Sequence, residues 1–239
     1  MVQLRIRTLT TPLAAPPPEH VLRALPRGCE PVLLDSSDGS SWSLLAWSPD
    51  RNCSGRLRPA AQPARSGSGP GGRWPLADRD PAAELAAACA GEDWLRDDPE
   101  PPLAGGWIGW LGFECAHGWE PFPWTPPDPS GLPDWHFARY RRAIAWSPDG
   151  AARLLWAELV GDPGARLERR RIEAEFRLAI AGAGRIAPAS GGWSGGRLEA
   201  VRPAAEYRAG VARLREWIGA GELFQANLSQ RLEGAAPAD

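Results

Sequence analysis

Three polar side chains, spaced two residues apart, are the clearest sign of chemistry in the sequence. Gln225, Asn227 and Ser229 alternate with apolar residues in the stretch GELFQANLSQRLEG. An alternation with a period of two predicts a strand, because successive side chains point to opposite faces. Amide and hydroxyl groups on a buried strand face need hydrogen-bond partners, which either protein groups or a ligand in a cleft can supply. The pattern is therefore compatible with a cleft-facing role and with a purely structural one.

The stretch PVLLDSS, residues 31–37, is a second candidate site. Its apolar run predicts a strand, and carboxylate and hydroxyl side chains follow where that strand should end. Short polar side chains of this kind often satisfy the backbone of a turn. They can also bind the amino group of a small ligand, and both interpretations stay open. Residues 42–50, WSLLAWSPD, predict the second strand of a hairpin with this run.

The glycine-rich run GGWIGWLG, residues 105–112, does not have the spacing of a nucleotide-binding motif. Neither GxGxxG nor a P-loop fits it, and a P-loop would also need a lysine that the chain lacks. We expect its glycines to let another backbone or a large ring approach closely, in preference to binding an anion.

The four cysteines, Cys29, Cys53, Cys89 and Cys115, are far apart and include no CxxC pair, so we expect buried thiols and no zinc site. His117 follows Cys115 by two residues. A nucleophilic Cys–His pair requires contact in the fold, which spacing alone does not establish. The sequence also has no GxSxG, HExxH or paired-carboxylate pattern, and it therefore assigns no catalytic residue and no metal ligand.

The composition is that of an ordinary globular protein, with 43% hydrophobic and 23% charged residues and a net charge of −2. Such a small net charge provides no broad basic field to attract nucleic acid or a membrane surface. No apolar run is long enough to span a bilayer, and the N-terminus lacks the apolar core of a secretory signal, so we expect a cytoplasmic protein. All 27 basic residues are arginine, which excludes a lysine Schiff base within this chain.

Hydrophobic periodicity and turn residues predict an α+β fold. Residues 2–9 alternate and predict an edge strand, whereas residues 134–146 and 152–159 flank the turn SPDG and predict a hairpin. Asp80 stands at the N-cap position of the helical stretch DPAAELAAACAG. A second helix should follow Asp162, and its mixture of charges predicts a solvent-facing outer surface.

Composition also suggests where the chain divides. Residues 1–185 predict a β-rich domain with two layers of strands covered by helices. A stretch rich in glycine, serine and proline follows, and it predicts a linker over residues 186–202. Residues 203–239 then begin a second domain with a helix and the alternating stretch described first.

Three segments together carry a family resemblance: AGGWIGWLGFE, GLPDWHFARYRRAIAWSPDG and YRAGVARLREWIGAGELFQANLSQRLEG. In order and spacing they resemble component I of aminodeoxychorismate synthase, which is related to anthranilate synthase component I and to the salicylate and isochorismate synthases. The last segment is the most specific, since it fits the family pattern G-[DE]-x-[FY]-Q-x-N-L-[ST]-Q-R. The matching residues are Gly221, Glu222, Phe224, Gln225, Asn227, Leu228, Ser229, Gln230 and Arg231.

The resemblance implies an N-terminal domain followed by an incomplete start of the chorismate-utilising domain. It implies that the full-length enzyme aminates chorismate to 4-amino-4-deoxychorismate, on the way to 4-aminobenzoate and folate. Ammonia would come from a glutamine amidotransferase partner. Mg²⁺ would hold the substrate carboxylate, and its ligands and the family's catalytic groups would lie outside this chain. We therefore expect the isolated chain to be inactive.

The early strand adds an implied ligand site. A serine at the end of this strand helps to hold bound tryptophan in the family, and Ser36 is the matching residue, with Leu34 beside it. The next part of the family motif is poorly matched, since Leu44 stands where a basic residue is expected. Two alternatives remain: anthranilate synthase component I of tryptophan biosynthesis, and a non-catalytic module that binds tryptophan or docks a partner.

Overall fold

The computed structural model describes residues 1–10, 15–59, 77–99, 101–120, 130–185 and 197–234. The chain divides into two compact units, Met1–Ile186 and Ala187–Asp239, which are described separately. Most of the predicted linker over residues 186–202 lies outside the described residues.

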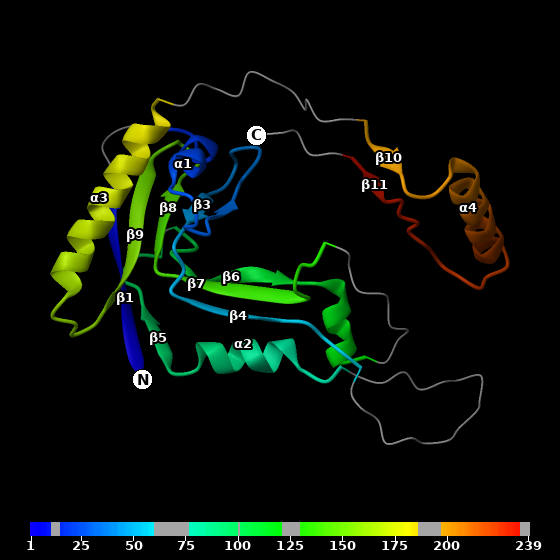
Figure 1. Ribbon diagram of the computed structural model, residues 1–239, viewed down its shortest axis with the longest axis horizontal. Coiled ribbons are helices and arrows are strands. Elements are labelled where there is room, and N and C mark those ends of the chain that lie inside the picture. The colour runs from blue at the N-terminus through cyan, green and yellow to red at the C-terminus, as the bar shows by residue number, and fades with distance from the viewer. Residues whose placement is uncertain (11–14, 60–76, 100, 121–129, 186–196, 235–239) are drawn as a thin grey trace. The chain divides into compact units, whose positions relative to one another are not determined.

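The first unit contains two sheets and the helices that cover them (Figure 1). The six-stranded sheet has the order β2-β3-β8-β9-β1-β5, and the three-stranded sheet has the order β4-β7-β6. The strands are β1 (Val2–Thr10), β2 (Val32–Leu34), β3 (Ser43–Ala46), β4 (Arg51–Gly55), β5 (Glu92–Leu95), β6 (Gly106–Leu111), β7 (Trp135–Tyr140), β8 (Arg142–Trp146) and β9 (Ala152–Leu159). The helices are α1 (Pro18–Ala24), α2 (Pro81–Cys89), the 3₁₀ helix η1 (Phe113–Gly118) and α3 (Ala165–Ala183).

Apolar side chains pack on both faces of the six-stranded sheet, which confirms the predicted α+β architecture of stacked strands under helices. On one face α1 and α3 cover a cluster built around Leu45, Ile144, Trp156 and Phe176. The opposite face packs against the three-stranded sheet through a cluster that mixes several alanines, among them Ala138, with larger apolar side chains such as Leu44 and Leu155.

The chain passes directly from one sheet into the other at Arg141. Strand β7 ends at Tyr140 in the three-stranded sheet, and β8 begins at Arg142 in the six-stranded sheet. The sequence predicted a single strand over residues 134–146, which is wrong, because an alternating pattern does not reveal a change of sheet. The predicted hairpin is confirmed, with β8 and β9 paired across the turn after Trp146.

Strand β1 is not simply an edge strand, which corrects the prediction for residues 2–9. It pairs with β9 from Leu4 to Thr10, and its other side pairs with β5 in parallel from Val2 to Arg5. The alternation was nevertheless informative, because Leu4 is fully buried on the face toward the second sheet. Apolar and charged residues alternate in β1 because the side chains of Arg5 and Arg7 lie on the opposite face of the strand from Leu4 and Ile6.

Helix α2 begins as its sequence predicts. Asp80 has an extended backbone, and its carboxylate accepts hydrogen bonds from the backbone N–H groups of Ala82 (2.9 Å) and Ala83 (3.2 Å). Pro81 occupies the first helical position, where no N–H is needed.

We expect Asp80→Ala to lower the free energy of unfolding of the first unit by about 1 kcal/mol, because two N–H groups at the helix start lose their acceptor. Asp80→Asn keeps an acceptor oxygen and should lower the free energy of unfolding by only a few tenths of a kcal/mol. Urea unfolding followed by circular dichroism measures both. Equal stability of the alanine and asparagine variants would contradict the capping role.

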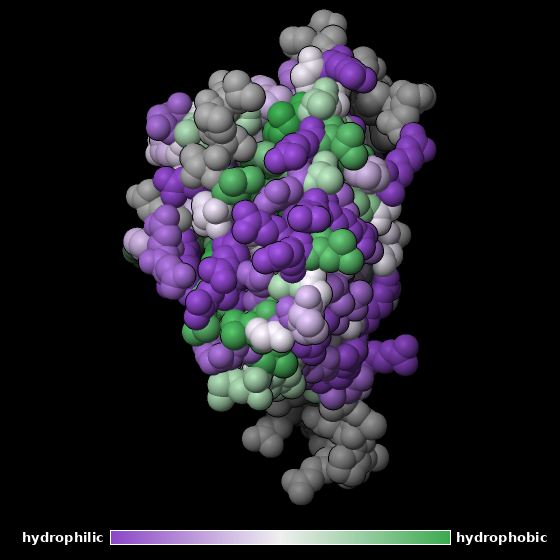
Figure 2. Space-filling model, turned by 90° about the vertical axis from the view of Figure 1, so that its left-hand side faces the viewer, coloured by the Kyte–Doolittle hydropathy of each residue, from purple (hydrophilic) through white to green (hydrophobic). Residues whose placement is uncertain are grey.

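The charged surface of α3 faces outward. Figure 2 views the side of the molecule on which α3 lies in Figure 1, and this side is largely hydrophilic. Ile172 and Phe176 lie on the opposite face of the helix and are buried. The prediction of a purely solvent-facing charged surface needs one correction. Glu168 and Glu175 turn back to the sheet, where they pair with Arg141 and Arg142.

The second unit contains β10 (Glu199–Ala200), α4 (Ala204–Gly219) and β11 (Leu232–Glu233), and the two short strands pair in antiparallel fashion. The predicted helix is confirmed. The predicted strand over residues 224–229 is wrong, since residues 225–230 have no regular secondary structure. A strand is defined by its paired neighbour. Among the described residues of this unit, β10 pairs with Leu232–Glu233, which lie beyond the alternating stretch. No helix in the described part of the chain is long and apolar enough to cross a membrane.

Candidate functional site

The loop between β2 and β3 uses its polar side chains to hold its own backbone. The Ser36 hydroxyl accepts a hydrogen bond from the Ser41 N–H (3.1 Å) and donates one to the Asp38 carboxylate (3.1 Å). Hydrogen bonds from Ser40, first of all from its backbone N–H, lower the pKa of Asp38. The hairpin between β2 and β3 is confirmed, and these contacts correspond to the turn-stabilising interpretation.

Leu34 and Ser36 occupy the end of β2 and the start of this loop. Leu34 is exposed, and Ser36 is half-buried. The Ser36 N–H donates to the Ser43 hydroxyl (3.0 Å), which itself donates to the Asp35 carboxylate (3.0 Å). The side chains of the loop thus hold its backbone through hydrogen bonds, whereas its role in binding a tryptophan-like ligand stays a prediction.

The three polar residues near the C-terminus lie in the second unit, and all three are exposed there. Ser229 borders a hollow of about 300 Å³ between α4 and the segment before β11. The Tyr207 hydroxyl contributes a long hydrogen bond to the Leu228 carbonyl (3.4 Å) across it. Gln225 and Asn227 do not line this hollow, so the unit does not bring the three together. Their cleft-facing role stays a prediction.

The glycine run lies in β6 and the residues before it, where it packs closely against β7. A Cβ added at Gly109 would lie 1.8 Å from the His136 carbonyl oxygen and 2.6 Å from the Phe137 Cα. One at Gly105 would lie 2.7 Å from the Tyr140 carbonyl oxygen. The prediction of close backbone packing is confirmed.

Cys115 and His117 lie in η1 and are both buried. The Cys115 thiol donates to the Asp134 carbonyl (3.2 Å), and burial raises its pKa. Burial also lowers the pKa of His117. A thiol that keeps its proton is a poor nucleophile, so this environment is that of a structural cysteine. The other three cysteines are free and half-buried, which fits the predicted thiols only in part.

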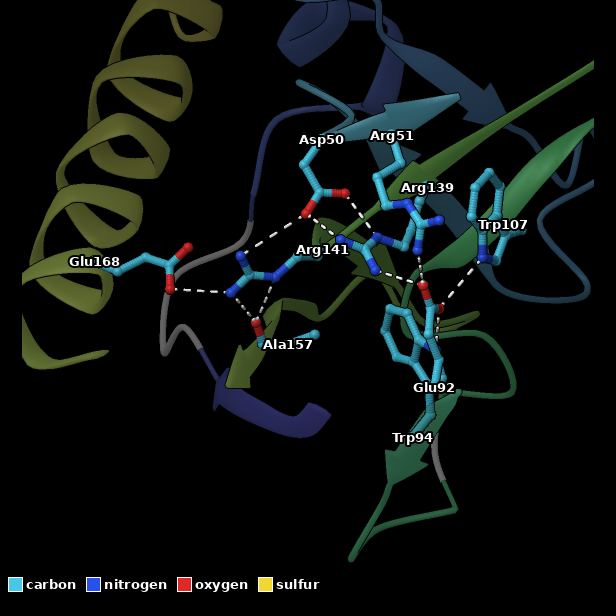
Figure 3. A network of polar contacts seen from close by, with 9 residues as sticks. All are labelled: Asp50, Arg51, Glu92, Trp94, Trp107, Arg139, Arg141, Ala157 and Glu168. Carbon is cyan, nitrogen blue, oxygen red and sulfur yellow. Dashed lines mark hydrogen bonds and ion pairs between the residues drawn. The ribbon is translucent and has the colours of Figure 1, made fainter. Parts of the chain in front are cut away.

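A network of charged side chains, which the sequence did not predict, joins the two sheets and α3 (Figure 3). At its centre Arg139 of β7 pairs with Asp50 through two hydrogen bonds of 2.7 Å and with Glu92 of β5. The Arg139 side chain is 12% exposed and that of Glu92 only 4%. The pKa of Arg139 is raised, mainly by its hydrogen bonds to Asp50 and also by the negative charges of Asp50 and Glu92.

Glu92 is the most deeply buried member of the network, and each of its two carboxylate oxygens accepts two hydrogen bonds. One carboxylate oxygen accepts from Arg51 (2.8 Å) and from Arg139, and the other accepts from the indole N–H groups of Trp94 (3.1 Å) and Trp107 (3.3 Å). A carboxylate that accepts from four donors has no free lone pair for a substrate proton. It positions strands, which general acid–base chemistry would not require.

Arg141 extends the network to the helix layer. Its guanidinium donates to the Ala157 carbonyl (2.9 Å) and to Glu168 of α3 (3.0 Å), and it lies 3.9 Å from Asp50. The network holds equal numbers of opposite charges, namely the three arginines Arg51, Arg139 and Arg141 and the three acids Asp50, Glu92 and Glu168. The sequence signal for it is a charged residue inside a largely apolar strand, as with Arg139 in WHFARY.

No group of three or more histidine, cysteine or acidic side chains in the described ranges could hold a metal ion. The described residues therefore do not provide the magnesium site that the family resemblance implies, and we derive no step through magnesium from them. The expectation that its ligands lie elsewhere stays a prediction.

Comparison with known proteins relates this architecture to one fold. The chain is similar to the crystal structure of anthranilate synthase component I from Streptococcus pneumoniae TIGR4, with a TM-score of 0.55 and 20% sequence identity over 93% of this chain and 48% of that chain. At this identity the likeness supports the fold alone.

Sequence relatives carry the same name. The chain is 33% identical over 145 residues to anthranilate synthase component 1 of Streptomyces coelicolor, covering 55% of this chain and 28% of the relative. It is 31% identical over 134 residues to that of Thermus thermophilus, with the same coverage, and 29% identical over 167 residues to that of Haloarcula marismortui, covering 64% and 33%. The chain thus spans a third or less of the length of these relatives.

The widest match is to a family model described as chorismate binding enzyme, which covers residues 30–239. It includes the β2–β3 loop, the charged network, the glycine run and the entire second unit. The chain belongs to the chorismate-binding enzyme family.

Proposed function

We propose that this chain is the N-terminal part of a chorismate-utilising synthase of the anthranilate synthase component I type. The match of residues 30–239 to the family model carries the proposal, together with the shared name of the relatives from three organisms. Within that enzyme the first unit acts as a scaffold, because its buried charges are neutralised in pairs and its buried thiol is protonated. Catalytic groups, magnesium ligands and contacts with a glutamine amidotransferase would come from other parts of the assembly.

The second candidate is aminodeoxychorismate synthase component I, which would replace the ring hydroxyl of chorismate with ammonia. Two sequence details favour it. Asp35 stands where the anthranilate enzymes typically have glutamate, and Asn227 fits the aminodeoxychorismate variant of the late motif. In the structure the shorter Asp35 carboxylate accepts from the Ser43 hydroxyl (3.0 Å), so the aspartate has a local role in the loop as well.

We expect the isolated 239-residue chain to give no product with chorismate, Mg²⁺ and ammonium. In a chimera, residues 1–239 of this chain replace the equivalent part of the Streptomyces coelicolor relative. We expect this chimera to be active, and the fluorescence of anthranilate measures its product. The unmodified relative is the positive control, and the relative without its N-terminal part is the negative one. Turnover by the chain alone, or a folded chimera no better than the negative control, would contradict the proposal.

Product identity separates the two candidates. The test uses the full-length enzyme that contains this chain. Chromatography of its reaction products should show anthranilate if the first candidate is right. It should show 4-amino-4-deoxychorismate for the second.

A further inference from the structure

A hollow of about 360 Å³ lies at the junction of β1, β5 and the residues that lead into β6. Its walls are mostly apolar or aromatic, and two charged side chains border it. The residues that matter for its chemistry are Ile6, Glu92, Trp94, Arg96, Leu103 and Trp107. Its volume is near the lower end of the range for small-molecule sites, which suits a compound with a single ring.

The two tryptophans present apolar surface to the hollow. Both indole N–H groups already donate to Glu92, at 3.1 Å for Trp94 and 3.3 Å for Trp107. Their ring surfaces therefore offer stacking and van der Waals contact, with no free donor. Flat aromatic partners gain about 0.5–1.5 kcal/mol from such contacts beyond the effect of area burial.

Of the two charged groups, Glu92 has no capacity for a ligand. Arg51, Arg139 and the two indoles occupy its oxygens, and its charge is balanced within the network. The Glu92 carboxylate is therefore not available to pair with a cationic ligand in this hollow.

Arg96, in contrast, carries a charge that no ion pair among the described residues balances. Its guanidinium donates to three backbone carbonyls, those of Asp98, Pro101 and Pro102. A guanidinium has five N–H donors, so two remain for another acceptor. The carbonyl contacts also fix the group in place, which lowers the entropic cost of using it to bind a ligand.

We propose that this hollow binds a monocyclic aromatic carboxylate, with its ring against Trp94 and Trp107 and its carboxylate on Arg96. The charge complementarity selects the anion, and the indole walls select the ring. An adjacent hollow of about 420 Å³ shares Ile6 and Arg96, and three acids, Asp97, Asp98 and Glu158, also line it. These acids balance the three arginines of that hollow, Arg7, Arg96 and Arg169, so it has no net positive charge and no aromatic wall of two indoles to favour an aromatic anion.

The test is a ligand-observed NMR titration of the 239-residue chain with benzoate, using benzamide as the neutral probe of the same shape. Because neither compound is a substrate of the proposed reaction, the result is independent of the proposed function. Benzoate should bind at least about tenfold more tightly than benzamide, since a charge-assisted hydrogen bond contributes more than a neutral one. Equal binding of the two probes, or no binding of either, would overturn the proposal.

Two variants locate the site. Arg96→Gln removes the charge and should weaken benzoate binding at least about tenfold. Leu103→Glu places a carboxylate at the exposed wall of the hollow while leaving the Arg96 contacts intact, and it should weaken benzoate but not benzamide. Arg7 lines the adjacent hollow and does not line this one, so Arg7→Gln is the matched control and should bind benzoate as the parent chain does. Undiminished benzoate binding by Leu103→Glu, or equal loss in Arg7→Gln, would overturn the assignment.

Discussion

Gly109→Ala is expected to lower the free energy of unfolding of the first unit by about 3 kcal/mol, at the upper end of the usual cost of an added methyl group. The new Cβ would lie 1.8 Å from the His136 carbonyl oxygen and 2.6 Å from the Phe137 Cα. Both neighbours are backbone atoms, which cannot rotate away as a side chain can. Strand β6 would have to separate from β7, and the ladder between them would be disrupted.

The midpoint of urea unfolding, followed by tryptophan fluorescence, measures this effect. Gly184→Ala is a matched control, because Gly184 is the C-cap of α3 in the same unit and a Cβ there would meet only atoms at 3.8 Å. We expect this control to change stability by less than about 1 kcal/mol. A Gly109→Ala variant as stable as the control would show that β6 and β7 are not packed as described.

The second large effect is expected at Glu92, where alanine should cost about 3 kcal/mol. Among the described residues, the substitution leaves Arg139, which is 12% exposed, with Asp50 as its one carboxylate partner, and it removes the acceptor of two indole N–H groups. Breaking one side of a buried pair is costly because the remaining charge has lost its water and gained no new partner. Glu92→Gln retains acceptor oxygen and should cost less than alanine.

Urea unfolding is again the measurement, because guanidinium chloride would screen the charges. The control is Glu173→Ala, which removes the pair with Arg169 one turn away on α3, where the arginine side chain is 55% exposed and that of Glu173 is 19% exposed. Pairs one helical turn apart contribute about 0.5 kcal/mol or less. If both alanine variants lost the same small amount, the network would be a surface feature and would not hold the sheets together.

Local features of the fold could be predicted from the sequence. The Asp80 cap, the turn after Trp146 and the close packing at Gly109 each depend on residues that are neighbours in sequence or on the absence of a side chain. The period of the hydrophobic pattern likewise identified α3 and α4 correctly.

Features that depend on distant partners could not be predicted. The stretch around Gln225 alternates as a strand does, yet a strand forms only where another backbone lies alongside, and alternation carries no information on that. The charged network is a similar case. Arg139 meets Glu92 and Asp50 across separations of 47 and 89 residues, and the topology alone brings them together. For Ser36, composition correctly indicated a turn, whereas a ligand role depends on groups beyond the loop.

The passage of the chain from one sheet to the other at Arg141 has a mechanical consequence. A continuous run of backbone belongs to both sheets, and its junction residue is clamped by a carbonyl of β9 and a carboxylate of α3. Neither sheet can slide over the other without stretching this junction or breaking the clamp. We therefore expect a displacement of one sheet to pull on the other through this junction.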